Sequence, residues 1–358
     1  MSASRLVLAV LAVLAFLGAA HLEVQAQGFA GLGTTAEGFT VPRQGVPLEF
    51  PRDHGAHPDF RIEWWYVTAN LKDGNGQDYG VQWTLFRSAL SPQTVQGWSD
   101  PQIWLGHAAV TTKDNHYFAE RLARGGVGQA GVTHQPFKAW IDEWDMQGTG
   151  EPEKDPVQNL RLRAQADTFG YDLALSANGP LVRQGDKGYS VKSASGQASF
   201  YYSQPYYDVD GQIILGGKSV KVTGKAWMDR EWSSQPLAAD QTGWDWFSLH
   251  LASGEKVMAF RLRDGGGGFS SANWVSANGE TISLSGDEVI IEPKQTTRVG
   301  DQTIPTGWRV KIPSKNLDVV TRPLNPQSWM GTTTPYWEGP ITFEGSTAGE
   351  GYLEMTGY

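Results

Sequence analysis

Two stretches of this sequence share the same order of residues: an acid, two aromatic residues, and then strand-like alternation. They are residues 63–69 (EWWYVTA) and 245–251 (DWFSLHL), and each is followed by a glycine turn and a second alternating segment. Alternation with a period of two is typical of β-strands, and short glycine turns between such segments predict hairpins. A second matching pair, 224–229 and 349–354, runs from a glycine through an aromatic residue to an acid. This order indicates an internal repeat of one β-unit.

Many further short segments alternate between apolar and polar residues, with glycine and proline between them. The sequence therefore predicts an all-β chain folded as antiparallel barrels or sandwiches. Because the repeated stretches occur in the same order, we place two similar β-units at residues 50–233 and 234–358. Chance similarity between short aromatic strands is the alternative. A small barrel has room for one ligand, and the 15 tryptophans favour an apolar one.

Charge and composition exclude several classes of protein. The formal net charge is −9, which argues against non-specific nucleic-acid binding. There is no cysteine, so disulfides, thiolate metal sites and cysteine nucleophiles are excluded. His54 and His57 stand three residues apart in a loop-like segment, which is a weak metal signal, and we predict neither a metal nor a cofactor. The Gly-x-Ser-x-Gly pattern of many serine hydrolases does not occur.

The first residues have the pattern of an export signal. Arg5 precedes an apolar run at 6–20, which is short for a membrane span, and small residues at 24 and 26 fit cleavage after Ala26. We therefore predict a signal peptide at 1–26 and a flexible lead-in at 27–49. The mature protein is expected in a periplasmic or extracellular space without stable membrane insertion. An uncleaved anchor helix is the alternative.

The first repeated string carries one candidate acid. Along a strand, Glu63 shares one face with the second residue after it, and the residues between take the other face. Burial beside indole rings raises the pKa of a carboxyl group, as a proton donor requires. The alternative is an ion pair between Glu63 and Arg61 or Arg87. The ligand-binding candidates near this acid are His57, Trp64, Trp65 and Tyr66.

The string 227–232 (WMDREW) carries two more candidate acids. Trp227, Asp229 and Glu231 alternate onto one face of the predicted strand. Two acids in one apolar site do not both ionise readily, so one of them is expected to stay protonated and serve as a general acid. In the alternative interpretation Asp229 caps a strand end and its arginine neighbour forms a salt bridge. Tyr201 and Trp246 are further candidates for the wall of a ligand pocket.

Together these strings resemble the AttH / carotenoid 1,2-hydratase family. The resemblance rests on 57–66, on 224–232 (GKAWMDREW) and on 244–247 (WDWF), and it extends over essentially all of the mature chain. Members of that family have two lipocalin-like β-barrels in tandem. The resemblance therefore implies an all-β fold of two tandem lipocalin-like antiparallel β-barrels and an apolar ligand.

The resemblance also implies a role for one residue. In hydratases of this family water adds across an isolated alkene, and the proposed acid is an aspartate two residues after an aromatic. The matching residues are Trp227 and Asp229. Those hydratases have a histidine upstream where this sequence has Tyr201, and a tryptophan where it has Ser203.

Two functions follow as hypotheses. The first is an exported protein that binds an apolar small molecule in a tryptophan-rich barrel pocket, with hydratase-like chemistry in which Asp229 protonates an alkene and Glu63 or Glu231 accepts a proton from water. The alternative is a non-catalytic carrier of a lipid or isoprenoid that acts beside an ABC-type transporter component. Many exported members of the family are labelled hydrolases, but this sequence contains no hydrolase motif that would support the label.

Overall fold

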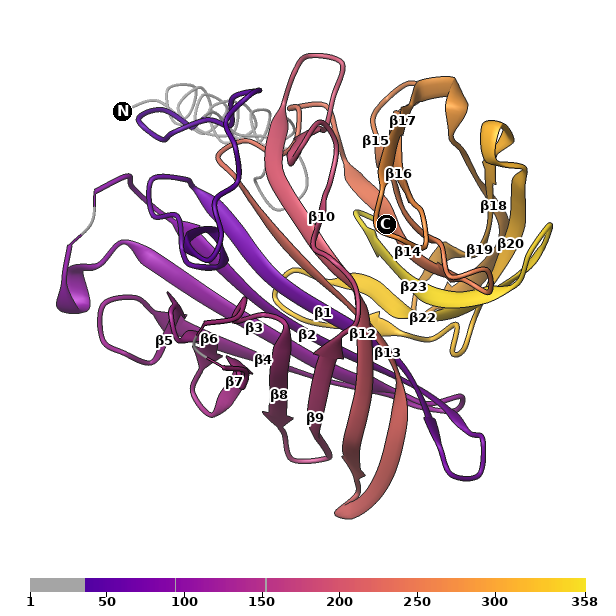
Figure 1. Ribbon diagram of the computed structural model, residues 1–358, viewed down its shortest axis with the longest axis horizontal. Coiled ribbons are helices and arrows are strands. Elements are labelled where there is room, and N and C mark those ends of the chain that lie inside the picture. Colours follow the sequence, from indigo (N-terminus) through magenta and orange to yellow (C-terminus); the bar gives the residue numbers. More distant parts are fainter. Residues whose placement is uncertain (1–35, 94, 152) are drawn as a thin grey trace, which may run out of the picture.

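The protein, described here from a computed structural model, consists of two curled antiparallel sheets (Figure 1). The structure describes residues 36–93, 95–151 and 153–358. These residues form no α-helix, only short 3₁₀ turns, so none of them crosses a membrane as a helix. The turns are η2 (Arg52–His54), η3 (Gly97–Ser99), η4 (Gly286–Glu288) and η5 (Pro313–Lys315).

The first sheet has 13 strands, in the order β4-β3-β2-β1-β13-β12-β9-β8-β7-β6-β5, with β10 and β11 also paired to β12. Its strands are β1 (Ile62–Asp73), β2 (Asp78–Ala89), β3 (Gln102–Thr111), β4 (His116–Arg124), β5 (Ala130–His134), β6 (Phe137–Ile141), β7 (Trp144–Gly148), β8 (Asn159–Gln165), β9 (Phe169–Ala177), β10 (Val182–Arg183), β11 (Tyr189–Val191), β12 (Ala198–Leu215) and β13 (Lys218–Ser233).

The second sheet has 10 strands, in the order β17-β16-β15-β14-β23-β22-β20-β19-β18, with β21 also paired to β22. Its strands are β14 (Gly243–Leu251), β15 (Lys256–Arg263), β16 (Phe269–Val275), β17 (Thr281–Ser285), β18 (Ile290–Val299), β19 (Gln302–Ile312), β20 (Leu317–Pro323), β21 (Trp329–Met330), β22 (Tyr336–Gly345) and β23 (Gly349–Thr356). Both sheets curl into the expected lipocalin-like barrels, which stand in tandem.

The repeated strings occupy matching places in the two sheets. In each sheet the first strand, β1 or β14, pairs with the second strand and with the last, β13 or β23. Trp227 lies opposite Thr68, and its repeat counterpart Tyr352 lies opposite Ser248. The repeat aligns Thr68 with His250, so the pairing in the second sheet is shifted by two residues. Because a shift of two residues keeps every side chain on its face, the repeat preserves which side chains point into each barrel.

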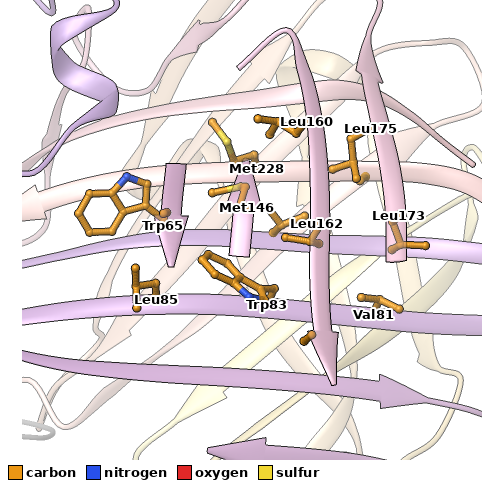
Figure 2. Packing of buried hydrophobic residues seen from close by; sticks show 14 of the residues in the cluster. Trp65, Val81, Trp83, Leu85, Met146, Leu160, Leu162, Leu173, Leu175 and Met228 are labelled. Atoms are coloured by element: carbon orange, nitrogen blue, oxygen red, sulfur yellow. The ribbon is translucent and has the colours of Figure 1, made fainter. Parts of the chain in front are cut away.

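The interior of the first barrel is filled by side chains. The sheet curls until β6 contacts β2, β3 and β4, and a continuous apolar core lies inside the curve. Figure 2 shows Trp65, Trp83, Leu162 and Met228 gathered into this core from four strands. Burial of large apolar side chains is the main stabilising contribution to such a barrel.

The two barrels pack against each other through outer faces of their sheets. Figure 1 shows the second barrel beside β1, β12 and β13, and β1 and β2 contact β23 and β22. An apolar cluster from both sheets seals this junction, namely Tyr66, Tyr201, Trp227, Leu237, Trp246, Met258, Phe260, Leu262 and Tyr352. Strand alternation explains the arrangement, because Trp227 points to the junction while Met228 points into the first barrel.

The predicted signal peptide, 1–26, lies outside the described residues. So does part of the predicted lead-in, and its described part, residues 36–49, lies along the first barrel. There the amide of Thr40 donates to the carbonyl of Asp59, and Leu48 is buried in the first core. The first sheet ends at Ser233 and the second begins at Gly243, on either side of a short connection that contains the predicted second boundary.

Candidate functional site

A cavity of about 670 Å³ lies between the two barrels. Its wall combines residues of β1, β2, β3 and β4 with residues of β14, β22 and β23. Apolar side chains predominate, among them Phe86, Leu105 and Trp244. We predicted a pocket inside a barrel; the first barrel's core fills that space, and the described cavity lies at the junction instead. The cavity volume lies within the range of about 300–1,000 Å³ that small-molecule pockets of other proteins have.

A second hollow of about 110 Å³ adjoins the first. The two share four wall residues: Ile62, Phe86, Trp244 and Glu354. Three of the predicted ligand-binding residues, Trp64, Tyr66 and Trp246, line this smaller hollow. The structure thus brings these three residues together at one hollow, which the two barrels form jointly, an arrangement that the sequence did not indicate.

Glu354 is the carboxyl group that reaches both cavities. It lies on β23, and the indole Nε1–H of Trp244 donates to its Oε1 at 2.5 Å. Burial raises its pKa to about 7; the Trp244 hydrogen bond opposes this shift, and the charges of Asp229 and Glu231 add to it. Near neutral pH a large share of Glu354 therefore carries a proton inside an apolar cavity, as a general acid requires.

Asp229 lies on β13, on the outer face that Trp227 also occupies at the junction, and it does not line either cavity. Its Oδ2 accepts a hydrogen bond from the Tyr201 hydroxyl at 2.6 Å, its Oδ1 accepts one from the Trp227 indole at 2.6 Å, and Ser203 donates as well. Burial raises its pKa to about 7 in spite of these three donors. Among the described residues the walls of the two cavities include Glu231 and Glu354 but not Asp229.

Tyr201 connects Asp229 to the smaller hollow. The indole of Trp246, a wall residue, donates to the Tyr201 hydroxyl oxygen at 3.1 Å, and that hydroxyl donates onward to Asp229. Tyr201 therefore connects the aspartate to Trp246 of the cavity wall, although Tyr201 itself is not among the residues that line either cavity.

Glu231 and Glu338 complete the acidic group at the junction. Glu231 is paired with the ammonium of Lys192 at 2.9 Å and also accepts from Ser199. The Tyr66 hydroxyl donates to Oε1 of Glu338 at 2.5 Å. Burial raises the pKa of Glu338 well above its usual value, and the nearby Glu354 raises it further.

Glu63 lies away from both cavities, in a buried cluster with two arginines. It lies on the inner face of β1, buried, and accepts from both Arg87 and Arg230. Although burial opposes its ionisation, the two guanidinium groups hold its pKa far below the usual range. The ion-pair alternative therefore describes its surroundings, with Arg230 as an additional partner that the sequence did not indicate.

His57 and Trp65 accompany Glu63 rather than the cavity. The His57 amide donates to Glu63 at 3.0 Å, and its ring stacks on Trp232 with 4.1 Å between centroids. Trp65 lies inside the first barrel, with the guanidinium carbon of Arg230 3.8 Å from its ring centroid. The predicted site residues on the first sheet thus divide between its two faces, whereas Trp246 lies on β14 of the second sheet.

Sequence reasoning missed Glu354 and Glu338 as candidate site residues. The repeat contained the signal for Glu354, since 349–354 aligns this residue with Asp229. Glu338 has no such counterpart among the repeated strings. No group of three or more His, Asp and Glu side chains in the part of the chain that the structure describes is arranged to hold a metal ion.

Comparisons with known proteins agree with this architecture. The sequence model of the AttH-like family matches residues 41–358. An AttH-type protein from Nitrosomonas europaea is 33% identical, with a TM-score of 0.80 over 89% of this chain and 99% of that chain. Kievitone hydratase from Nectria haematococca is 18% identical, with a TM-score of 0.66 over 90% of this chain and 98% of that one, and shares the fold. A search of the curated proteins gave no match. The chain therefore belongs to the AttH-like family.

Proposed function

We propose that this protein is an exported enzyme that binds an apolar small molecule in the cavity between its barrels and adds water to an alkene or enol ether of that molecule. The observation that carries the proposal is Glu354, a carboxyl group with a pKa of about 7 that lines both hollows among aromatic side chains. The fold shared with a protein named kievitone hydratase gives further support. Export rests on the leader-like pattern at 1–26.

The chemistry needs one proton donor, one water molecule and one proton acceptor. The carboxyl group transfers its proton to one alkene carbon, and the π electrons form the new C–H bond. A cation remains on the other carbon, where aromatic faces such as Trp64 and Trp244 stabilise it. Water attacks this carbon, and its extra proton passes to a carboxylate, so the net change is the addition of one H₂O. Glu231, held by Lys192, lies on the same wall as an acceptor.

Two carboxyl groups are candidates for the donor. Glu354 reaches the cavity directly, whereas Asp229, the acid that the family resemblance implies, acts through the Tyr201 hydroxyl. In this route the Tyr201 hydroxyl, which donates to Asp229 in the structure, turns to give its proton to the substrate and takes up the proton of a protonated Asp229. The two routes differ in one respect: only the second needs the hydroxyl of Tyr201.

Native mass spectrometry after incubation with a lipid extract of the producing cells tests the proposal. The wild type should release a species heavier by one water molecule than the molecule trapped by Glu354→Gln or Asp229→Asn. Glu344→Gln, at an exposed carboxyl group of the second sheet, is the matched control and should behave as the wild type. A Tyr201→Phe variant that keeps turnover would exclude the Asp229 route.

The same measurement separates catalysis from carriage. If the wild type and both acid variants hold the same unchanged molecule, the protein is a carrier. If none of them retains any apolar molecule, the cavity is not a ligand site and the proposal is wrong.

A further inference from the structure

A chain of hydrogen bonds crosses the junction at another part of the large cavity. Nε2 of His107 lies 3.1 Å from Oε1 of Glu120, and Nδ1 of His107 lies 2.8 Å from the Tyr336 hydroxyl. Glu120 and His107 belong to the first sheet, on β4 and β3, while Tyr336 begins β22 of the second. His107 and Tyr336 both line the cavity.

Glu120 is fixed as an ionised acceptor. The Thr333 amide donates to it at 3.0 Å and the Thr333 hydroxyl at 2.7 Å. The hydrogen bonds from His107 and Thr333 lower the pKa of Glu120 to about 2. The carboxylate therefore accepts from His107 and has no proton to give.

The direction of every bond in the chain follows from this carboxylate. Burial lowers the pKa of His107, so the ring is neutral and has a single N–H, which Glu120 draws to Nε2. Nδ1 is then an acceptor. Burial and the nearby Glu338 and Glu354 carboxyl groups raise the pKa of Tyr336 well above its usual value, so its hydroxyl keeps its proton. Nδ1 of His107, 2.8 Å away, accepts this proton in a hydrogen bond, and the lone pairs of the Tyr336 oxygen remain to accept.

The apolar surroundings make this oxygen selective. The His107 ring stacks on Tyr336, with 5.5 Å between centroids, and meets Phe86 edge-on at 5.4 Å. Two other polar side chains lie near the Tyr336 oxygen: Nε2 of Gln82 donates to it over a long 3.5 Å, and the Glu338 carboxyl group interacts with the hydroxyl. A ligand group placed here without a proton to donate would lose its own hydration and gain no hydrogen bond.

We infer that the Tyr336 oxygen, oriented by His107 and Glu120, is a hydrogen-bond acceptor site for a hydroxyl group on the otherwise apolar ligand. The ligand class is therefore an apolar molecule that carries an alcohol or phenol, and not a pure hydrocarbon. This inference rests on the proposed function only in placing the ligand in the junction cavity. Tyr336 is a specificity-determining residue and His107 a positioning residue.

Glu354 is the diagonal neighbour of Tyr336 across β22 and β23, because Tyr336 pairs with Thr356. Diagonal neighbours on such strands lie about 7–8 Å apart. A hydroxyl bound at Tyr336 would hold the ligand with its neighbouring carbons near the carboxyl group. The acceptor site thus also fixes which bond of the ligand meets the acid.

Three probes of similar size test the inference through quenching of tryptophan fluorescence. 2-Naphthol has a hydroxyl donor, 2-methoxynaphthalene has an acceptor only, and 2-methylnaphthalene has neither. The wild type should bind 2-naphthol roughly five- to tenfold more tightly than 2-methylnaphthalene, as one net hydrogen bond provides. 2-Methoxynaphthalene should show no such advantage.

Two variants separate the roles of the residues. Tyr336→Phe should bind 2-naphthol and 2-methylnaphthalene equally, without losing affinity for the latter. His107→Phe frees the Tyr336 proton, so 2-methoxynaphthalene should gain over 2-methylnaphthalene, a change that a merely structural role would not produce. Tyr206→Phe is the matched control, because that hydroxyl donates to the Ser276 carbonyl at 3.0 Å, away from the large cavity.

The outcomes distinguish this inference from the proposed function. Equal binding of 2-naphthol and 2-methylnaphthalene by the wild type, or discrimination that survives in Tyr336→Phe, overturns the acceptor site and leaves the apolar cavity intact. If Tyr336→Phe does not fold, the relative affinity of His107→Phe for 2-methoxynaphthalene and 2-methylnaphthalene is the deciding measurement, and no gain for 2-methoxynaphthalene contradicts the inference. Failure of the wild type to bind any of the three probes contradicts both the acceptor site and the cavity as a ligand site.

Discussion

Glu338 and Glu354 lie directly opposite each other on the antiparallel strands β22 and β23. Burial raises the pKa of both; the charge of Glu354 raises the pKa of Glu338 further, and the charges of Asp229 and Glu231 raise that of Glu354. The described residues place no arginine or lysine salt bridge on either one. Near neutral pH Glu338 is therefore protonated and Glu354 partly so, and this has measurable consequences.

The stability of the protein should depend on pH through Glu354. Its folded pKa, about 7, is above the ordinary value, so the folded state binds a proton that the unfolded state releases between roughly pH 4.5 and 7. This contribution is complete at low pH and is lost as pH rises through 7. Between pH 5 and 8 the wild type should lose about 2–3 kcal/mol more than Glu354→Gln in urea unfolding.

Comparison with the variant removes from this measurement the titrating groups that do not interact with Glu354. Buried His116 and His250, with pKa values lowered by burial to about 4 and about 3, act in the opposite direction, but equally in both proteins. Glu344→Gln, at an exposed position, should follow the wild type at every pH. Parallel curves for the wild type and Glu354→Gln would mean that Glu354 ionises in the folded state as an ordinary glutamate.

Trp244→Phe should raise the pKa of Glu354 further. The indole N–H donates to this carboxyl group at 2.5 Å and stabilises the ionised form, and phenylalanine keeps the ring but not the donor. A hydrogen bond to a charged group is worth enough to shift the pKa by about one unit. Carboxyl ¹³C NMR titration measures the shift. Trp98→Phe, at a side chain that is 74% exposed, should leave the titration unchanged.

Arg230→Met should destabilise the protein by about 3–5 kcal/mol, because it leaves the buried Glu63 with one guanidinium instead of two and removes the cation from the face of Trp65. Arg322→Met is the matched comparison. Its pair with Glu344 is exposed at both ends, so the loss should stay under about 1 kcal/mol. Chemical denaturation of both variants gives the two free energies of unfolding. A similar small loss in both would show that Arg87 alone satisfies Glu63.

Gly224→Ala should cost about 1–3 kcal/mol through overpacking. A Cβ at this position of β13 would lie 2.0 Å from the carbonyl oxygen of Asn70 on the neighbouring strand β1, and backbone must move to admit it. Gly74→Ala places its Cβ in open space in the turn after β1 and should change stability by less than about 0.5 kcal/mol. Thermal melting compares the two. Equal melting temperatures would show that β1 and β13 separate at this point at little cost.

The faces of the strands could be predicted from the sequence. Alternation placed Glu63 with Trp65, and Asp229 with Trp227 and Glu231, and the structure has the same two groups. Which group faced the ligand could not be decided in this way, because a strand buried on both sides gives no contrast between apolar and polar faces. The first group belongs to the barrel interior, whereas the second lies at the junction.

The sequence by itself determined the all-β fold, the duplication and the family, because strand period, turn residues and the repeated aromatic strings are local or pairwise signals. Only the tertiary structure decided that the cavity lies between the barrels, that Glu63 is neutralised by two arginines, and that Glu354, His107 and Tyr336 share one cavity. These depend on contacts between residues more than a hundred positions apart, such as His107 and Tyr336. Such contacts arise from the packing of one finished sheet on another, which leaves no periodic trace along the chain.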